Sequence, residues 1–438
     1  MPLPSIHQLW QAALAEEHAI KQDLTNLREK IDKRFETMLA NPKLVRELFD
    51  FTREHDPILI APRLAVVSRA PDVREVLEQD SVFSVREIYA AKMESTTGDF
   101  VLGMDTATAQ YETERSLMQQ ILRPDDLETI DALVRETAEE LVAKAAPQGE
   151  MDIVSDLTRV VPARLVAKFF GTPGPDEAKL MRWMRAIFRD IFLNLGNDPG
   201  MHAEGEAAAK ELNAYLDDLI ATRKPQIAGH PGRYDDYLSR LIKVQQADPT
   251  RVDDETIRRI LGGTIVGTVD TNSKAVAQAI DQLLARPDAL ASAQEAAQAD
   301  DITDVAPYVW EALRFNPQNP FLIRHCERDY TIADGTPRAR KIPAGSLVLA
   351  GTMSAMFDPD AVPEPDTFRT DRPAGAYMHF GDGPHQCFGR HMAGRLIPRV
   401  AQALLRRPGL RRAGGAEGHL RYDGAFPDGL NVTFEATP

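Results

Sequence analysis

A ten-residue segment near the C-terminus has the residue types needed to hold a metal through a single thiolate. It runs from Phe380 to Gly389 and contains one cysteine, Cys387. Its glycines permit tight turns and close approach of a ligand, and the apolar run from Met392 predicts a helix that begins just after the cysteine. A helix N-terminus favours the anionic thiolate, and Phe380 and Phe388 can shield the sulfur from water. The segment therefore indicates a thiolate metal ligand beside a flat group such as haem.

A zinc site is the alternative interpretation of this segment. His379, His385, Cys387 and His391 are all possible zinc ligands. Against zinc, there is no C-x-x-C spacing, and the other cysteine of the chain, Cys326, lies 61 positions upstream of Cys387.

The segment resembles the cysteine loop of the cytochrome P450 family, in which phenylalanine, glycine, a basic residue, cysteine and glycine recur at fixed offsets. Phe380, His385, Cys387 and Gly389 occupy these offsets. The resemblance implies a mostly α fold with small β-sheets, in which haem b lies between a long central helix and the helix of the cysteine loop. It also implies that Cys387 is the proximal iron ligand, whose thiolate favours cleavage of the O–O bond.

Two further stretches match a structural triad of that family. Glu311 and Arg314 have Glu-x-x-Arg spacing at the end of an apolar helix, which the sequence Asn316-Pro317 should terminate. Arg372 follows in a proline-rich stretch before the cysteine loop. A carboxylate shared by two guanidinium groups makes charge-assisted hydrogen bonds of fixed geometry. The resemblance implies that this triad is structural and holds the segment behind the cysteine.

Haem carries two propionates, so cationic side chains from separate segments should converge on them. The resemblance implies this role for Arg115, Arg324 and His385. Where the family often has a second histidine, this chain has Tyr111, which can donate a hydrogen bond but carries no positive charge.

The central helical stretch from Leu261 to Asn272 contains glycine and threonine at mid-helix positions, where they weaken the backbone ladder. Asp270 and Thr271 resemble the acid–alcohol pair of the family. That resemblance implies that Thr271 hydrogen-bonds the bound dioxygen and that Asp270 relays protons. Thr268 stands where the family has a smaller residue. One alternative is an Asp-Thr pair without a proton role, at a helix N-cap or in mid-helix. Another is a register shifted by one residue to Val269-Asp270, which would favour chemistry that rearranges peroxides.

The substrate pocket is expected to be apolar, because the segments at the pocket positions of the family are rich in aliphatic and aromatic residues. The expected pocket residues are Ile265, Val266, Val269, Phe321, Leu322 and Phe426. Such a pocket predicts a lipophilic or aromatic small molecule as substrate.

Seven arginines and no acidic residue lie between Cys387 and Arg412, although the chain has a net charge of −15. Arg390, Arg395 and Arg399 are expected to form a docking face for an acidic, ferredoxin-like electron donor. The alternative is that the arginines near the end of this helix stabilise its dipole. The acidic balance elsewhere argues against nucleic acid as a partner.

The elements that position these residues are mostly helical. Helical periodicity is expected over roughly 8–55, 107–122, 126–145, 154–170, 177–195, 203–223, 255–285, 289–298 and 304–315. Short strands are expected near 58–60, 64–67, 330–332 and 347–349, with a C-terminal hairpin that turns at Pro427-Asp428-Gly429. No linker or repeat divides the 438 residues, which predicts a single domain, with 1–55 as an extra helical segment that does not fold separately.

The sequence also indicates a compartment and an activity. Two distant cysteines agree with a reducing compartment, and no signal peptide or run of 18 apolar residues is present, so the cytoplasm without a membrane anchor is expected. The resemblance implies a monooxygenase that uses O2 and a separate electron donor. A peroxide-dependent or peroxide-rearranging haem enzyme and a non-catalytic haem sensor or carrier are the alternatives.

Overall fold

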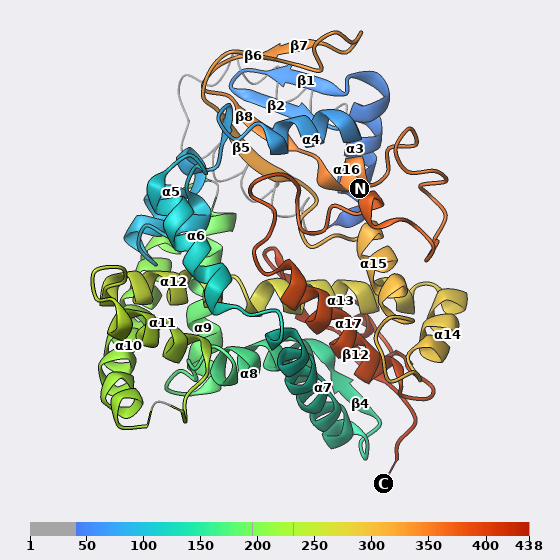
Figure 1. Cartoon of the computed structure of the whole chain (residues 1–438). Helices are drawn as coiled ribbons and strands as arrows, with labels where there is room; N and C mark the ends of the chain where they lie inside the picture. The colour runs from blue at the N-terminus through green and yellow to red at the C-terminus, as the bar shows by residue number, and fades with distance from the viewer. Residues whose placement is uncertain (1–40, 195, 231, 438) are drawn as a thin grey trace.

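The computed structural model describes residues 41–194, 196–230 and 232–437, and in that part of the chain helices predominate (Figure 1). The N-terminal segment expected to be helical lies outside the described residues up to residue 40. The longer helices are α3 (Pro42–His55), α4 (Ala70–Glu78), α5 (Arg86–Ser95), α6 (Ala109–Ile121), α7 (Asp126–Ala145), α8 (Val160–Lys168), α9 (Glu177–Phe188), α10 (Pro199–Gly229), α11 (Tyr237–Ala247), α12 (Asp254–Val266), α13 (Val269–Leu284), α14 (Pro287–Ala296), α15 (Ala306–Phe315) and α17 (Arg390–Leu405).

The strands are short and form small sheets. The largest has five strands in the order β1-β2-β8-β5-β3, and the others pair β10 with β11, β6 with β7, and β12 with β4 and β9. The strand bounds are β1 (Ile58–Ala61), β2 (Leu64–Val67), β3 (Phe83–Ser84), β4 (Glu150–Asp152), β5 (Leu322–Cys326), β6 (Tyr330–Ile332), β7 (Arg340–Ile342), β8 (Leu347–Ala350), β9 (Arg411–Arg412), β10 (Arg421–Asp423), β11 (Phe426–Gly429) and β12 (Asn431–Thr433).

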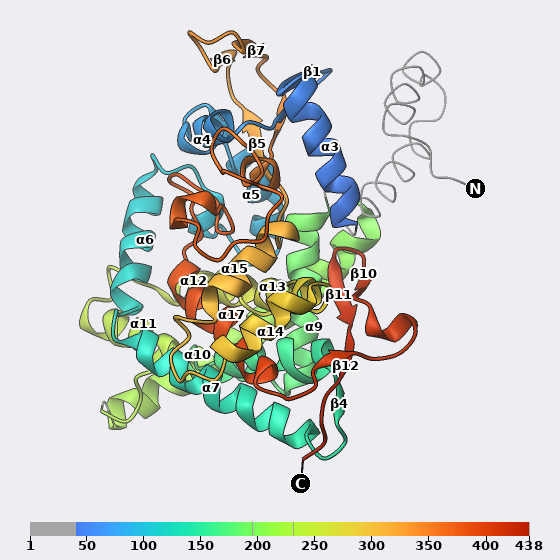
Figure 2. The same cartoon turned by 90° about the vertical axis from the view of Figure 1, so that its right-hand side faces the viewer.

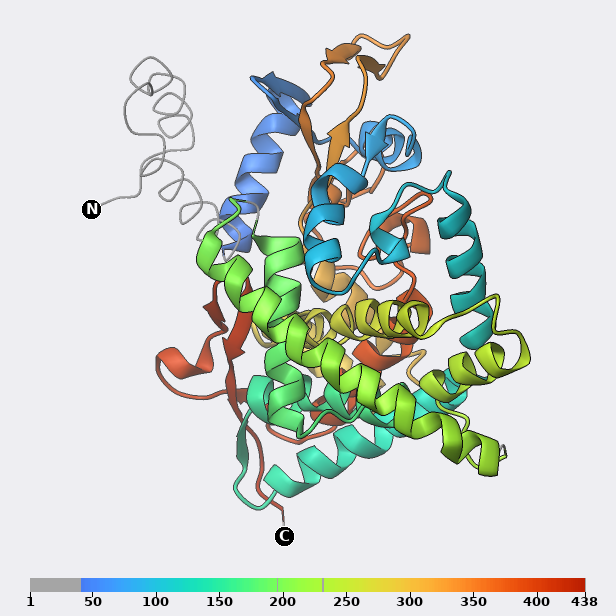
Figure 3. The same cartoon turned by 90° about the vertical axis from the view of Figure 1, so that its left-hand side faces the viewer.

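The apolar residues gather in two cores. The smaller core surrounds the five-stranded sheet, with α3, α4 and the short helix α16 (Thr352–Ala355). The larger core joins the helices, and α13 lies at its centre against α15 and α17 (Figures 1 and 2). Seen from the side in Figure 3, the long helix α10 crosses this helical part and packs against α9 and α12. The cysteine loop lies where the two cores meet.

Most predicted helices are present, but two predictions at specific positions are wrong. The stretch expected as one helix over 255–285 is divided into α12 and α13 at Gly267 and Thr268. The expected C-terminal turn at Pro427–Gly429 is wrong, because those residues pair with β10 inside β11. The chain instead reverses at Gly424, whose φ of +58° is accessible to glycine at little cost.

Candidate active site

The cysteine loop is a compact turn that leads directly into α17. Helix α17 begins at Arg390, as the sequence predicted, with Gly389 as its N-cap residue. The backbone N–H of Cys387 donates to the carbonyl of Phe380 at 2.9 Å, which closes the loop. Gly383 has a φ of +69°, and a side chain there would collide with the carbonyl of Leu77. Only glycine therefore lets this loop pack against the end of α4.

The thiol of Cys387 faces a cavity of about 420 Å³ that lies between the two cores. Cys387 is exposed toward this cavity, yet protein surrounds it on the other sides. This burial raises the pKa of the thiol, against the opposing effects of the Gly389 N–H and the Arg390 charge. Phe380 and Phe388 also line the cavity, where they restrict access to the sulfur.

The zinc alternative is wrong for the part of the chain that the structure describes, since no group of three possible ligands is close enough to hold a metal ion. The Nε2 of His379 instead contacts the carbonyl of Trp310 at 2.9 Å, and burial lowers the pKa of His379 to about 4. His385 contacts Asp80.

Arg324 is the strongest sign that the cavity receives an anionic group. Its side chain lines the cavity and is 4% exposed, and burial lowers its pKa. Its one hydrogen bond among the described residues goes to the carbonyl of Ile323 at 2.9 Å, and no ion pair joins it to a described carboxylate. A buried guanidinium that no carboxylate contacts is costly, even with the charge of Asp80 acting from a distance. A haem propionate would neutralise it, so the residues present fit haem.

The other predicted propionate partners lie in the same cavity lining. Arg115 lies over the ring of Tyr111, with its guanidinium carbon 5.5 Å from the ring centre. The Tyr111 hydroxyl donates to the carbonyl of Pro384 at 3.3 Å, so it supports the cysteine loop directly. Arg115, Arg324 and His385 thus converge from α6, β5 and the cysteine loop.

Asp80 is a site residue that the sequence did not reveal, because it lies 305 positions from its partner His385. The carboxylate also accepts from the N–H and hydroxyl of Thr106, at 2.9 and 2.6 Å. Burial would raise the pKa of Asp80, but the bonds from His385 and Thr106 outweigh it and lower the pKa to about 2. Asp80 therefore orients His385 as an ionised carboxylate.

The lowered pKa predicts an acid-dependent contribution to stability. An aspartate whose pKa falls from 3.8 to about 2 on folding stabilises the protein above pH 3.8, and this stabilisation is lost as the pH falls toward 2. We expect Asp80→Asn to lower the free energy of unfolding by about 1 kcal/mol at pH 7, because solvent screens part of the interaction. The difference should shrink between pH 4 and pH 2, as measured by urea unfolding.

Asp382→Asn is the matched control, since Asp382 lies in the same loop and pairs with Arg74 at 3.3 Å in a more exposed position. It should change stability less than Asp80→Asn does. Equal effects of the two substitutions, or a loss for Asp80→Asn that persists unchanged at pH 2, would contradict the assigned role of Asp80.

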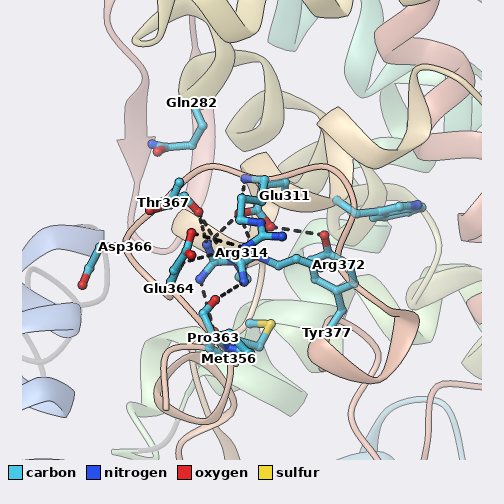
Figure 4. Close-up of polar contacts among 12 residues, drawn as sticks. Gln282, Glu311, Arg314, Met356, Pro363, Glu364, Asp366, Thr367, Arg372 and Tyr377 are labelled. Carbon is cyan, nitrogen blue, oxygen red and sulfur yellow. Dashed lines mark hydrogen bonds and ion pairs between the residues drawn. The ribbon is translucent and has the colours of Figure 1, made fainter. Parts of the chain in front are cut away.

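The structure brings Glu311, Arg314 and Arg372 together in one buried cluster (Figure 4). Arg314 binds both carboxylate oxygens of Glu311, at 2.9 and 2.6 Å, and Arg372 adds a contact of 3.2 Å. The hydroxyl of Tyr377 donates to the same carboxylate at 3.2 Å. Burial would raise the pKa of Glu311, but Arg314 and its other partners outweigh it and lower the pKa.

The cluster also anchors the chain that precedes the cysteine loop. Arg372 donates to the carbonyls of Pro363, Glu364 and Thr367 at 2.7–2.8 Å, as Figure 4 shows. Arg314 reaches the carbonyl of Met356 at 3.2 Å. These bonds connect α15 to the irregular segment between α16 and the cysteine.

The interruption between α12 and α13 opens onto the cavity. Thr264, Gly267, Thr268 and Thr271 line it, at the three- and four-residue spacing of one helix face. Side-chain hydroxyls hydrogen-bond backbone carbonyls near the interruption. The Thr268 hydroxyl donates to the carbonyl of Thr264 at 3.0 Å, and the Thr271 hydroxyl donates to the carbonyl of Gly267. The hydroxyls therefore stabilise the break and also face the cavity.

Asp270 points away from this face. It is 1% exposed and does not belong to the cavity lining. Its Oδ1 pairs with Arg185 at 3.0 Å and with Arg159 at 3.4 Å, whereas its Oδ2 has no hydrogen-bond partner among the described residues. The predicted acid–alcohol pair is thus divided, with Thr271 in the cavity and Asp270 behind it.

The predicted pocket residues are partly wrong. Phe321 and Leu322 line the cavity, but Ile265, Val266, Val269 and Phe426 lie in the helical core. The three helix residues lie on other faces of α12 and α13 than the lining threonines. Phe426 packs against Phe188 at 5.8 Å between ring centres, and its neighbour Ala425 lines the cavity instead. Phe100, Phe192 and Leu193 also line the cavity.

The predicted docking face loses one member. Arg399 is 5% exposed and binds Asp131 at 2.6 and 3.0 Å, so its inclusion was wrong: this arginine ties α17 to α7. Arg406 and Arg412 are also paired, with Glu139 at 3.0 Å and Asp281 at 2.7 Å. Arg390 and Arg395 have no ion pair with any described residue, and Arg395 is exposed.

Comparison with known proteins gives a consistent result. The family profile described as Cytochrome P450 matches residues 57–407. The cytochrome P450 monooxygenase PikC of Streptomyces venezuelae is 30% identical over 66% of this chain and 62% of its own length. The vitamin D(3) 25-hydroxylase of Pseudonocardia autotrophica is 26% identical, over 84% of this chain and 86% of its own.

Solved structures show the same fold. The crystal structure of CalO2 aligns with a TM-score of 0.77 at 24% identity, covering 91% of this chain and 97% of its own. Within the residues that the structure describes, no helix is long and apolar enough to span a bilayer.

Proposed function

Because this chain belongs to the cytochrome P450 family and is a haem-dependent monooxygenase, we propose that it inserts one oxygen atom from O2 into a lipophilic small molecule. We further propose haem b as the cofactor, a separate ferredoxin-like protein as the electron donor, and the cytoplasm as the compartment. The observation that carries the proposal is a single cavity lined by the thiol of Cys387, the unpaired guanidinium of Arg324 and the hydroxyl of Thr271.

Each of these groups has a distinct role in the proposal. Cys387 would bind the iron, and Arg115, Arg324 and His385 would hold the propionates. When bound, the haem supplies the iron at which dioxygen is activated by two electrons delivered one at a time. Glu311, Arg314 and Arg372 would keep the cysteine loop in place without contacting the reaction.

Thr271 and Asp270 would transfer protons into the cavity. The Thr271 hydroxyl faces the cavity and can hold a water molecule or a proton there. Asp270 lies one residue earlier with an unsatisfied Oδ2, and its other oxygen is held by Arg185 and Arg159. We propose that Asp270 passes protons from that side of α13 toward Thr271.

Substitution of Thr271 by alanine tests this function. With electrons supplied by a ferredoxin and its reductase, the fraction of consumed O2 that is released as hydrogen peroxide should rise about tenfold, because one positioned proton donor is removed. Oxygen uptake and peroxide are measured together. Ser273→Ala is the control: it removes a hydroxyl from α13 that bonds Thr158 at 2.8 Å, away from the cavity. Turnover that requires peroxide and no reductant would favour the peroxide-dependent alternative instead.

Electron delivery can be tested at Arg395, which is exposed near the cysteine end of α17. Charge reversal by Arg395→Glu should slow reduction by an acidic ferredoxin roughly tenfold at low salt, and the difference should fade as salt screens the charges. The measurement is the reduction rate by stopped flow. The control is Arg411→Glu on β9, an exposed arginine that bonds the carbonyl of Gly409. Equal slowing in both variants would exclude a docking site at Arg395.

A further inference from the structure

The described lining of the cavity has an unusual charge. The chain contains 66 acidic residues against 51 lysines and arginines, yet no aspartate or glutamate belongs to that lining. Four fixed cations do: Arg115, Arg189, Lys274 and Arg324. The cavity therefore favours anions, in a protein whose overall charge is strongly negative.

The two haem propionates account for only part of this charge. Arg115 and Arg324 lie with His385 and Asp80 at one end of the cavity, and Arg324 feels the charge of Asp80. Lys274 comes from α13, whereas the residues assigned to the propionates come from α6, β5 and the cysteine loop. Burial alone lowers the pKa of Lys274 to about 8. Lys274 is thus outside the group of residues assigned to the propionates.

Lys274 lies on α13 one turn after Thr271, and its side chain is 9% exposed. Its ammonium group has no hydrogen bond or ion pair with any described residue. Charged groups on and around α13 are already engaged: Asp270 with Arg185, and Glu311 with Arg314. A buried ammonium without a counter-charge is destabilising, so an anion that entered the cavity would be bound strongly there.

A second polar group without a hydrogen-bond partner among the described residues lies near Lys274 on α13. Gln278 lies one turn beyond Lys274 and lines the cavity. Its Nε2 donates to the Oδ1 of Asn316 at 3.1 Å, but its Oε1 has no hydrogen-bond partner among the described residues. Apolar residues such as Phe100, Phe192 and Leu193 also line the cavity, and Phe100 packs against Gly263 on α12 rather than near Lys274 on α13. A lining of this composition fits a ligand with one polar, anionic end and an apolar body.

We propose that the substrate is a lipophilic carboxylate whose anionic end pairs with Lys274. The inference rests on the proposed function, since it names the substrate class of the same cavity. It assigns Lys274 to substrate binding and specificity, separately from the residues that hold haem.

The test compares two carboxylic acids with their amides, which are similar in size and shape but carry no charge. Decanoic acid and decanamide are titrated calorimetrically at pH 7 into haem-loaded protein, and 3-phenylpropanoic acid with its amide is a second pair. We expect each acid to bind wild-type protein about tenfold more tightly than its amide. In Lys274→Gln this preference should fall to within about twofold. Lys341→Gln, which removes a lysine of β7 that pairs with Asp329 at 2.6 Å outside the cavity, should retain it.

Urea unfolding of ligand-free Lys274→Gln shows whether the substitution affects folding as well as binding. If Lys274 lacks a counter-charge, ligand-free Lys274→Gln should unfold at the same or a higher urea concentration than wild type. A clear loss of stability would mean that the amine is already neutralised in the ligand-free protein, and it would overturn the proposal. The proposal would also be overturned if the acids bound wild-type protein no more tightly than the amides. It would likewise be overturned if the preference for acids were lost in Arg189→Gln but kept in Lys274→Gln.

The spectrum of the reduced, carbon monoxide-treated samples reports separately on the proposed function. A thiolate-type spectrum with no preference for acids would remove only the inference about Lys274. A preference for acids over amides that depends on Lys274 would support the binding site even if the reduced protein with carbon monoxide gave no thiolate-type spectrum.

Discussion

Cys387→Ala is expected to abolish the strongly red-shifted Soret band that the reduced protein should show with carbon monoxide. That band requires a thiolate ligand on the iron, and Cys387, the one cysteine in the described lining of the cavity, would supply it. Because burial raises the pKa of its thiol, the protein by itself favours the neutral form. The thiolate is therefore expected when iron binds, since a coordinating thiol is deprotonated by the metal.

Cys326→Ala is the matched control for this experiment. Cys326 is buried in the five-stranded sheet, where its Sγ contacts the carbonyl of Arg328 at 3.1 Å, and it does not line the cavity. Its substitution should leave the band in place. Survival of the band in Cys387→Ala, or its absence from intact haem-loaded protein, would require another axial ligand and would contradict the proposed monooxygenase chemistry.

Glu311→Gln is expected to have the largest effect on stability. The carboxylate is fully buried and receives two guanidinium groups, a phenol and the backbone N–H of Arg369 at 3.0 Å. Removing its charge leaves Arg314 buried without its ionised partner, a change that typically costs about 3–5 kcal/mol. Because Arg314 and Arg372 anchor the segment before the cysteine loop, haem retention should fall together with stability.

The measurement is the urea midpoint of the holoprotein, together with the haem content after purification. Glu364→Gln is the control, since Glu364 pairs with Arg369 at 3.2 Å on the surface of the same segment. Exposed ion pairs of this kind contribute up to about 1 kcal/mol. A Glu311→Gln protein that retains haem and unfolds at the wild-type midpoint would show that the cluster does not hold the loop.

Local patterns were sufficient for the predicted parts of the site. The cysteine loop depends on glycines at fixed offsets, and its conformation is closed by contacts within the loop itself, such as the bond from Cys387 to Phe380. Glu311 and Arg314 are three residues apart on a helix, so their spacing already brings them together. The order and extent of most helices follow from apolar periodicity in the same way.

Other features depend on contacts between distant parts of the chain. Asp80 orients His385, and Asp131 holds Arg399 in a buried ion pair from 268 positions away. No local pattern in the sequence could reveal either contact. The interruption at Gly267 and Thr268 decides which residues of α12 and α13 face the cavity. The predicted pocket on Ile265, Val266 and Val269 was therefore wrong, although the stretch itself was found.

The sequence by itself indicated the family, the proposed iron ligand and the members of the buried triad. The cysteine loop and the Glu311–Arg314 pair can be recognised from residue types at short spacing, and Arg372 from its place in the proline-rich stretch before that loop. Only the tertiary structure decided that Asp270 faces Arg185 while Thr271 faces the cavity, and that Lys274 is buried there without an ion pair to any described residue. The physical reason is that charge pairing and burial are properties of three-dimensional neighbours. Side chains one helical turn apart can therefore have opposite environments once the surrounding helices are packed.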